Sequence, residues 1–135
     1  MVAAIQNFGA PAASIPPRPF FTNMIEQKSI GWASSLGRLL VATKYDTHAA
    51  LAMMGEGIKA QLQESIKDTN APALSKITIM LRKMRSEDQT LEVTGAVVGE
   101  AARRVAEGES LAGVSTKPLN DSAHMQNSVE YEVLG

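Results

Sequence analysis

The chain has 135 residues, no cysteine and a formal net charge of −1 at pH 7. These numbers suit a single domain over residues 1–135, exclude disulfides, thiolate zinc sites and a cysteine nucleophile, and give no positive field that would attract nucleic acid. Aromatic residues make up only 4% of the chain, which favours helix over an all-β fold. No apolar run approaches the roughly 18 residues of a membrane span, and no secretory signal is visible, so we expect assembly in a cytoplasm and no membrane partner.

The chain begins with a segment that is predicted to be a strand followed by an extended arm. Residues 2–8 are a short apolar run, and four prolines follow between residues 11 and 19. Proline fixes φ near −65° and removes a backbone donor, so this stretch should be extended. Two alternatives are open: a loop on the surface of the domain itself, or an arm that lies on a neighbouring subunit.

Residues 22–85 are predicted to form a helical core. Helically spaced apolar residues predict one helix over residues 23–44, which its glycines weaken and can kink. The longest periodic run is residues 46–68, where apolar residues recur at steps of three and four. Asp46 or Thr47 can cap the start of this central helix by accepting a hydrogen bond from a free backbone N–H.

The central helix carries two glycines, Gly55 and Gly57. Each destabilises a helix by about 1 kcal/mol relative to alanine. Both glycines therefore need a reason: a close contact with another segment, a kink, or a break into two helices.

The second half of the chain is predicted to add short helices and a closing strand. Ser75 can cap a third helix, and residues 86–116 are expected to be an insertion with a short fourth helix. Residues 117–135 should form a turn and then a strand, because apolar and polar residues alternate from Val129 to Val133. The predicted fold class is α+β: three to four helices, a small sheet from the two chain ends, and the extended proline-rich N-terminal arm.

No group of residues suits catalysis or metal binding. His48 and His124 are far apart in the sequence and have no acidic neighbours at ligand spacing, so each is expected on the surface. The glycines that flank Glu56 are not followed by the Lys-Ser/Thr of a phosphate loop. We therefore expect a protein that is not an enzyme, has no cofactor or metal, and serves a binding or structural role.

Three stretches of the sequence together resemble one family. They are NFGAPAASIPPRPFF (residues 7–21), ALAMMGEGIKAQLQESIKDTNAPALSKITI (residues 50–79) and KPLNDSAHMQNSVEYEV (residues 117–133). They are similar to the proline segment, the long helix with its following turn, and the closing segment of tail-completion and neck proteins of tailed bacteriophages. The match covers about half of the chain in the same order. It departs at residues 121–123, where Asp-Ser-Ala stands in place of Asp-Thr-Gly.

The resemblance implies a structural virion protein of the head–tail junction. Members of the family form rings around the DNA channel and join a head-side connector to a tail terminator or tail tube protein. For this chain the resemblance implies a homo-oligomeric ring, with six copies favoured over twelve, and double-stranded DNA passing through its lumen without sequence-specific contact. The candidate subunit or partner contacts are Pro16, Pro17, Arg18, Pro19, Phe20, Phe21, Asp121, Asn127 and Tyr131.

Basic residues of the predicted third and fourth helices are candidates for lining the DNA channel. They could meet phosphates without reading sequence. We rank this below a plain solvated face, whose cations near helix C-termini complement the helix dipole. The candidates are Arg82, Lys83, Arg85, Arg103 and Arg104.

A second class of function stays open, that of a small helical module outside any virion that binds a protein or nucleic acid. The ring predicts a symmetric assembly with residues 10–21 ordered against another chain. The module predicts a monomer or dimer in which the same residues are mobile.

Overall fold

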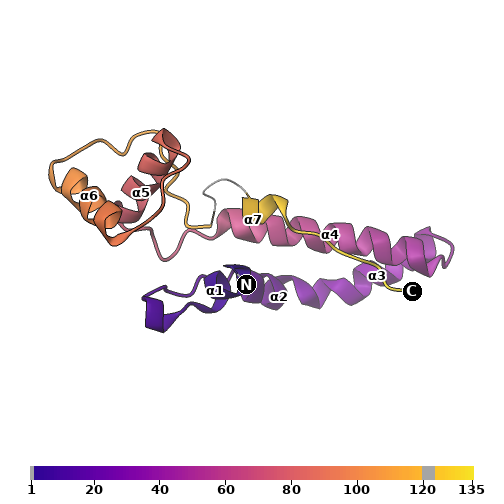
Figure 1. The fold of residues 1–135 in the computed structure, drawn as a ribbon. Helices are drawn as coiled ribbons and strands as arrows, with labels where there is room; N and C mark the ends of the chain where they lie inside the picture. Colours follow the sequence, from indigo (N-terminus) through magenta and orange to yellow (C-terminus); the bar gives the residue numbers. More distant parts are fainter. Residues whose placement is uncertain (1, 120–123) are drawn as a thin grey trace.

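The structure is a computed structural model that describes residues 2–119 and 124–135 (Figure 1). The chain is mostly helical. The helices in chain order are α1 (Val2–Phe8), α2 (Phe20–Lys28), α3 (Trp32–Ala42), α4 (Thr47–Asp68), α5 (Lys76–Glu87), α6 (Gly95–Ala106) and α7 (His124–Asn127), with short 3₁₀ turns at Pro11–Ala13 and Ser29–Gly31.

The helices form an elongated rod and a smaller lobe (Figure 1). In the rod, α2 and α3 run antiparallel to α4, and α1, α7 and the C-terminal segment of residues 128–135 lie beside them. The lobe consists of α5, α6 and the loops around them, and residues 69–75 connect it to the end of α4. The α3–α4 turn stands at one end of the rod, whereas α1 and the lobe stand at the other.

The structure confirms the predicted central helix and its cap. α4 is continuous, and Asp46 Oδ1 accepts a hydrogen bond from Ala49 N at 3.0 Å. Ser75 Oγ caps α5 in the same way by accepting from Thr78 N at 3.1 Å. The first predicted helix is split into α2 and α3 by a 3₁₀ turn, and the short fourth helix is α6.

The predicted α+β class is wrong, because the residues that the structure describes contain no strand. Residues 2–8 form α1, in which Ala3 and Ala4 are strong helix formers. The C-terminal segment runs along α4 without a partner strand in the described chain. A strand is stable only when a neighbour satisfies its backbone N–H and C=O groups. The predicted sheet would have paired residues 2–8 with the C-terminal segment. Because residues 2–8 form a helix, the C-terminal segment has no strand to pair with.

The predicted extended arm is also wrong, because the proline-rich segment closes on itself. Ala10 N donates to Ile15 O at 2.9 Å, and Ile15 N donates to Ala10 O at 3.1 Å. Gly9 turns the chain with a φ of +76°, and a Cβ there would lie 2.8 Å from Ile15 O. Arg18 N then donates to Gln6 O at 2.7 Å, which ties the segment to α1 as a loop on the chain's own surface.

A close contact explains one of the two glycines in α4. The Tyr131 ring lies directly on Gly55: an added Cβ would lie 2.7 Å from Cε2 and 2.9 Å from Cγ of that ring. A larger residue would therefore displace the C-terminal segment. Gly57 has open space at its Cβ position, and nothing in the structure explains it.

The rod and the lobe have separate hydrophobic clusters. The buried members of the rod cluster are Phe20, Ile66 and Leu119. The buried members of the lobe cluster are Met80, Met84 and Ala101. Residues of the expected insertion, 86–116, supply α6 and so complete the lobe.

Candidate interaction surfaces

The three stretches that carry the family resemblance meet in the rod cluster. Phe20 comes from the first stretch, Ile66 from the second and Leu119 from the third, and none is more than 6% exposed. The partly buried residues packed against them are Leu62, Met125 and Val129. Residues near both ends of the chain therefore share one cluster with α4.

A buried asparagine joins α1 to the start of α2. Asn7 is 3% exposed, and its Oδ1 accepts hydrogen bonds from Phe21 N at 3.0 Å and Thr22 N at 3.3 Å. Its Nδ2 donates to Thr22 Oγ1 at 2.9 Å. Pro19, at the cap position of α2, has no side-chain acceptor, so Asn7 caps the helix from a distance. No local sequence signal links this asparagine to a helix that begins after the proline-rich loop.

An apolar groove of about 460 Å³ opens between α1, α2, α4 and the segment after α7. Phe8 and Phe21 stand at its α1–α2 side and are 72% and 43% exposed. Leu62, Val129 and Glu130 line the groove from α4 and the C-terminal segment. We call this feature the rod groove. Its size and apolar lining suit a few side chains of another molecule.

The candidate contact residues divide into buried and accessible ones. Arg18 and Phe20 are 6% and 3% exposed, so they support the fold and cannot meet a partner directly. Phe21 lines the rod groove, and Tyr131 is 39% exposed over α4. The candidates with other placements are Pro16, Pro17 and Asn127, which are accessible to solvent, Pro19, which is half-buried, and Asp121, which lies outside the described residues.

Arg18 fastens the start of the chain to the linker before the lobe. Its Nε donates to Pro72 O at 3.3 Å, and its Nη1 donates to Gln6 Oε1 at 3.3 Å. Burial lowers the pKa of Arg18, and the positive charge of Arg82 on α5 lowers it further. Arg82 in turn donates to three backbone carbonyls of residues 115–118. Both arginines therefore organise the junction of rod and lobe.

The far end of the rod exposes apolar side chains on a strained turn. Val41 and Tyr45 are 64% and 72% exposed, and Leu51 and Met53 at the start of α4 are 42% and 54% exposed. Lys44 and Tyr45 have φ of 52° and 65°, in the left-handed region that favours glycine or asparagine. We call Val41, Lys44, Tyr45, Leu51 and Met53 the rod tip. Sequence reasoning missed this surface. The signal that could have found it is the short connection between two predicted helices, which contains a tyrosine and neither glycine nor asparagine.

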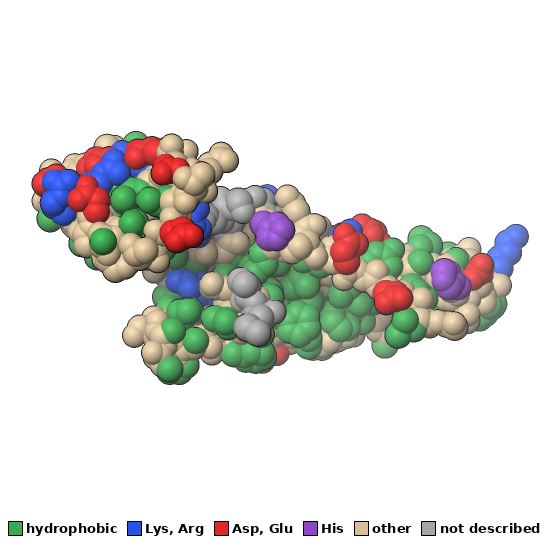
Figure 2. Space-filling view, viewed as in Figure 1, with side chains coloured by type: hydrophobic (Ala, Val, Ile, Leu, Met, Phe, Trp, Pro, Cys, Tyr) green, Lys and Arg blue, Asp and Glu red, His purple; other side chains and the backbone are tan. Residues whose placement is uncertain are grey.

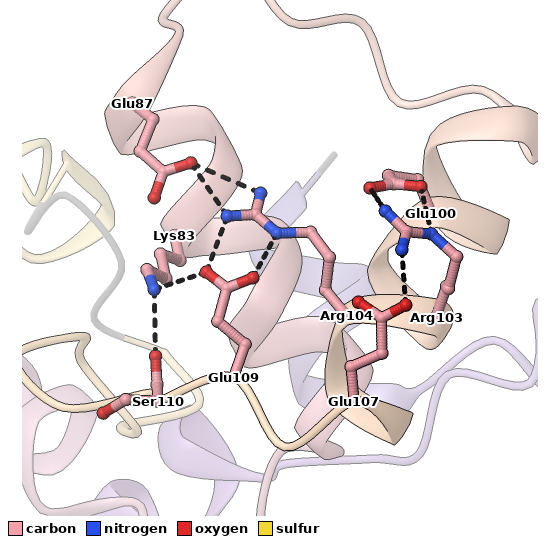
Figure 3. Close-up of polar contacts among 8 residues, drawn as sticks. All are labelled: Lys83, Glu87, Glu100, Arg103, Arg104, Glu107, Glu109 and Ser110. Atoms are coloured by element: carbon pink, nitrogen blue, oxygen red, sulfur yellow. Dashed lines mark hydrogen bonds and ion pairs between the residues drawn. The ribbon is translucent and has the colours of Figure 1, made fainter.

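Three of the five basic candidates, Lys83, Arg103 and Arg104, are paired with carboxylates of the lobe (Figure 3). Glu109 lies between two of them: its Oε1 is 2.6 Å from Lys83 Nζ, and its Oε2 is 2.5 Å from Arg104 Nε. The hydrogen bonds from Arg104, and next from Lys83, lower the pKa of Glu109 to about 2. Arg104 also reaches Glu87 at 3.3 Å. Sequence reasoning missed Glu109, whose position after α6 becomes meaningful only when α5 and α6 pack.

Arg103 is paired in a second group on the outer face of α6 (Figure 3). It contacts Glu100 at 2.6 Å and Glu107 at 2.5 Å, at helical spacings of three and four. The Glu100 contact is the first cause that raises the pKa of Arg103. Arg85 is exposed and is in no ion pair within the part of the chain that the structure describes. A phosphate would have to displace intramolecular partners at Lys83, Arg103 and Arg104.

The visible surfaces of rod and lobe differ in kind (Figure 2). Acidic and basic side chains are interspersed over the lobe, whereas hydrophobic side chains gather along the rod and at its tip. Among residues 2–119 and 124–135, no helix combines the length and hydropathy needed to cross a membrane. The same residues contain no cluster of three potential metal-ligating side chains.

No protein-family model matches the sequence, no curated protein matches it, and no solved structure matches the fold.

Proposed function

We propose that this chain is a structural protein of the neck of a tailed bacteriophage, where it forms a ring that joins the head-side connector to the tail. The observation that carries the proposal is the convergence of the three resembling stretches on one cluster. Phe20, Ile66 and Leu119 come from separate stretches and are buried together. The three resembling stretches therefore belong to one structural unit of the chain.

The apolar surface of the rod also supports an assembly role. Large apolar side chains that are exposed to water gain free energy when a partner covers them. Here Phe8 and Tyr45 are each 72% exposed, and Leu134 in the C-terminal segment is 81% exposed. A ring subunit covers such surfaces with its neighbours or with the proteins above and below it. The partners in this proposal are further copies of the chain, a connector and a tail terminator or tail tube protein.

DNA enters the proposal as cargo that passes through the ring. Because Arg103 and Arg104 are already paired with carboxylates, a close phosphate contact is favoured at Arg85 over either of them. The alternative function is a helical module outside a virion that binds a protein. The rod groove could bind the partner protein of such a module as well as a neighbour in a ring. The two proposals therefore differ in whether the protein is found in virus particles.

The test is the protein content of tailed particles from the strain that encodes this chain. The proposal predicts that mass spectrometry finds the chain in purified particles, at a copy number that is a small multiple of the portal's symmetry. Deleting its gene should leave filled heads and separate tails. Particles that lack the chain, or join normally after its deletion, would contradict the neck assignment and favour the module.

Complementation of that deletion tests the rod surface. Phe21→Ser removes an exposed apolar side chain from the rod groove, and Val98→Ser removes one from the lobe, where Val98 is 38% exposed. Only the Phe21 variant should fail to restore joined particles. Equal restoration by both variants would show that the groove has no part in joining.

A further inference from the structure

We propose that the lobe is a hinged body on the rod and that Arg18 is the latch that fixes its orientation. The hinge consists of two chain segments that cross between the lobe and the rod: the outgoing linker, residues 69–75, and the returning segment, residues 115–119. The latch is the hydrogen bond from Arg18 Nε to Pro72 O. This inference concerns the chain alone and goes beyond the neck assignment without depending on it.

The rod and the lobe are joined by chain segments more than by packed helices. The main helix contacts of the described chain pair α2, α3 and α7 with α4, α1 with α2, and α5 with α6. Each of these pairs lies within one region, and each region has its own hydrophobic cluster. Figure 1 shows the lobe beyond the end of α4, across the outgoing linker. Two bodies of this kind move relative to each other unless specific contacts prevent it.

The outgoing linker is exposed and held at one point. Ala71, Pro72 and Ala73 are exposed to solvent. Apart from the bond that Arg18 donates to Pro72 O, no hydrogen bond joins residues 71–74 to the rest of the described chain. Pro72 lies midway between the end of α4 and the start of α5. Arg18 therefore holds the middle of the linker, where one contact controls the direction in which α5 leaves the rod.

The returning segment is fixed on both sides and serves as the pivot. Arg82 of α5 donates from Nη1 to Lys117 O at 2.8 Å and from Nη2 to Pro118 O at 3.1 Å, which ties the segment to the lobe. The next residue, Leu119, is buried in the rod cluster. Rotation about this point would change the direction of the lobe without separating the two regions, as in other hinge motions.

Arg18 connects the outgoing linker to the start of the chain. Its Nη1 donates to Gln6 Oε1 on α1, and its Nε donates to Pro72 O, each at 3.3 Å. Arg18 is only 6% exposed. A buried guanidinium is stable only when its donors are satisfied, so the two acceptors hold the side chain in one place. Arg18 is a positioning residue, because it acts on the lobe through the linker.

The charge of Arg82 opposes the latched arrangement. Arg82 belongs to the lobe and Arg18 to the rod, and after burial the positive charge of Arg82 is the second cause of the lowered pKa of Arg18. Like charges on the two sides of the junction favour its opening. Without the bond to Pro72 O, the lobe should therefore turn away from the rod, while each region keeps its own core.

The test is the distance between rod and lobe, measured by double electron–electron resonance on the full chain. The chain has no cysteine, so labels can be placed at Ala60→Cys in α4 and Ala96→Cys in α6, both exposed positions. With Arg18 in place, this pair should give one narrow distance distribution. Arg18→Met removes both hydrogen bonds and the charge, so the distribution should broaden or shift. A pair within the rod, Glu26→Cys with Met53→Cys, should be unaffected.

Three further variants separate the latch from a general effect on the fold. Arg85→Met, which changes an exposed arginine of α5, is the matched control and should leave the rod–lobe distribution unchanged. Arg18→Lys keeps the charge but lacks the planar fork that reaches two acceptors, so its broadening should be intermediate. Gln6→Ala removes the acceptor on α1 without changing Arg18 itself and should broaden the same distribution to a smaller degree.

The outcomes decide the proposal in both directions. A rod–lobe distribution that is already broad with Arg18 in place would overturn the latch. So would one that stays equally narrow in Arg18→Met and Gln6→Ala. Broadening of the rod pair together with the rod–lobe pair would also overturn it, because Arg18 would then support the packing of the rod and not the orientation of the lobe.

Discussion

The rod and the lobe bury similarly small clusters, yet they treat the rest of their surface differently. The lobe surrounds Met80 and Ala101 with ion pairs centred on Arg103, Arg104 and Glu109. The rod instead exposes apolar side chains at its tip, its groove and its C-terminal segment. Charged surfaces remain soluble alone, whereas exposed apolar surfaces gain free energy when a partner covers them. The comparison indicates that the rod is the part of the molecule built for association.

Truncating one core residue in each region should have the largest effect and would show whether the two clusters are independent. Ile66→Ala in the rod and Met80→Ala in the lobe should each lower the free energy of unfolding by about 2–5 kcal/mol, because both side chains are almost fully buried. Hydrogen exchange should accelerate mainly in the region that carries the change. Val98→Ala, at an exposed position of α6, is the control and should change little. Equal acceleration in both regions after either change would show one cooperative unit instead of two.

Removing the cap that α1 supplies to α2 should destabilise the rod alone. Asn7→Ala leaves the N–H groups of Phe21 and Thr22 without their acceptor and should reduce the free energy of unfolding by about 1–2 kcal/mol. Asn23→Ala, at an exposed site in α2, is the matched control. Urea denaturation measures both. A loss at Asn23 as large as at Asn7 would contradict the capping role.

The two glycines of α4 should respond differently to alanine. Gly57→Ala meets open space and should stabilise the helix by up to about 1 kcal/mol. Gly55→Ala should push the Tyr131 ring away and offset that gain, so the C-terminal segment should exchange its amide hydrogens faster. Thermal unfolding and hydrogen exchange of residues 128–135 check the pair. Equal stabilisation by both substitutions would mean that Tyr131 does not pack on α4.

Acid should weaken the lobe before the rod, with the smallest effect of the four. The pKa of Glu109 is lowered from 4.5 to about 2 in the folded chain, so its contribution is complete above about pH 4.5 and is lost as the pH falls toward 2. Solvent screens these partly exposed pairs, which limits the magnitude of the effect. Amide exchange of α6 at about pH 6 and about pH 3, corrected for the intrinsic rate, measures it. Glu109→Gln should reduce the difference, leaving the part that Glu100 contributes through Arg103, and an unchanged pH dependence in that variant would contradict the role of Glu109.

Much of the helical fold was predictable because its signals are local. Asp46 and Ser75 precede periodic apolar runs, and both cap the helices they were expected to cap. The predicted sheet was wrong because the alternation of apolar and polar residues around Tyr131 shows only that one face of the segment is covered. The same pattern arises whether a sheet or a helix covers that face. Gly55 is the residue that indicates the actual neighbour, because a glycine inside a helix allows another segment to pack closely against it, as Tyr131 does. The Asn7 cap and the Glu109 pairs depend on tertiary packing, and no spacing in the sequence indicates them.

The most direct test of the account is hydrogen–deuterium exchange of the full chain at low and high protein concentration. The account predicts that residues 2–8, 41–53 and 124–135 become protected as concentration rises, because further copies cover the exposed apolar side chains of the rod. Residues 95–106 of the lobe should exchange at an unchanged rate. Exchange that is independent of concentration throughout the rod, or new protection confined to α6, would contradict the claim that the rod is the associating surface.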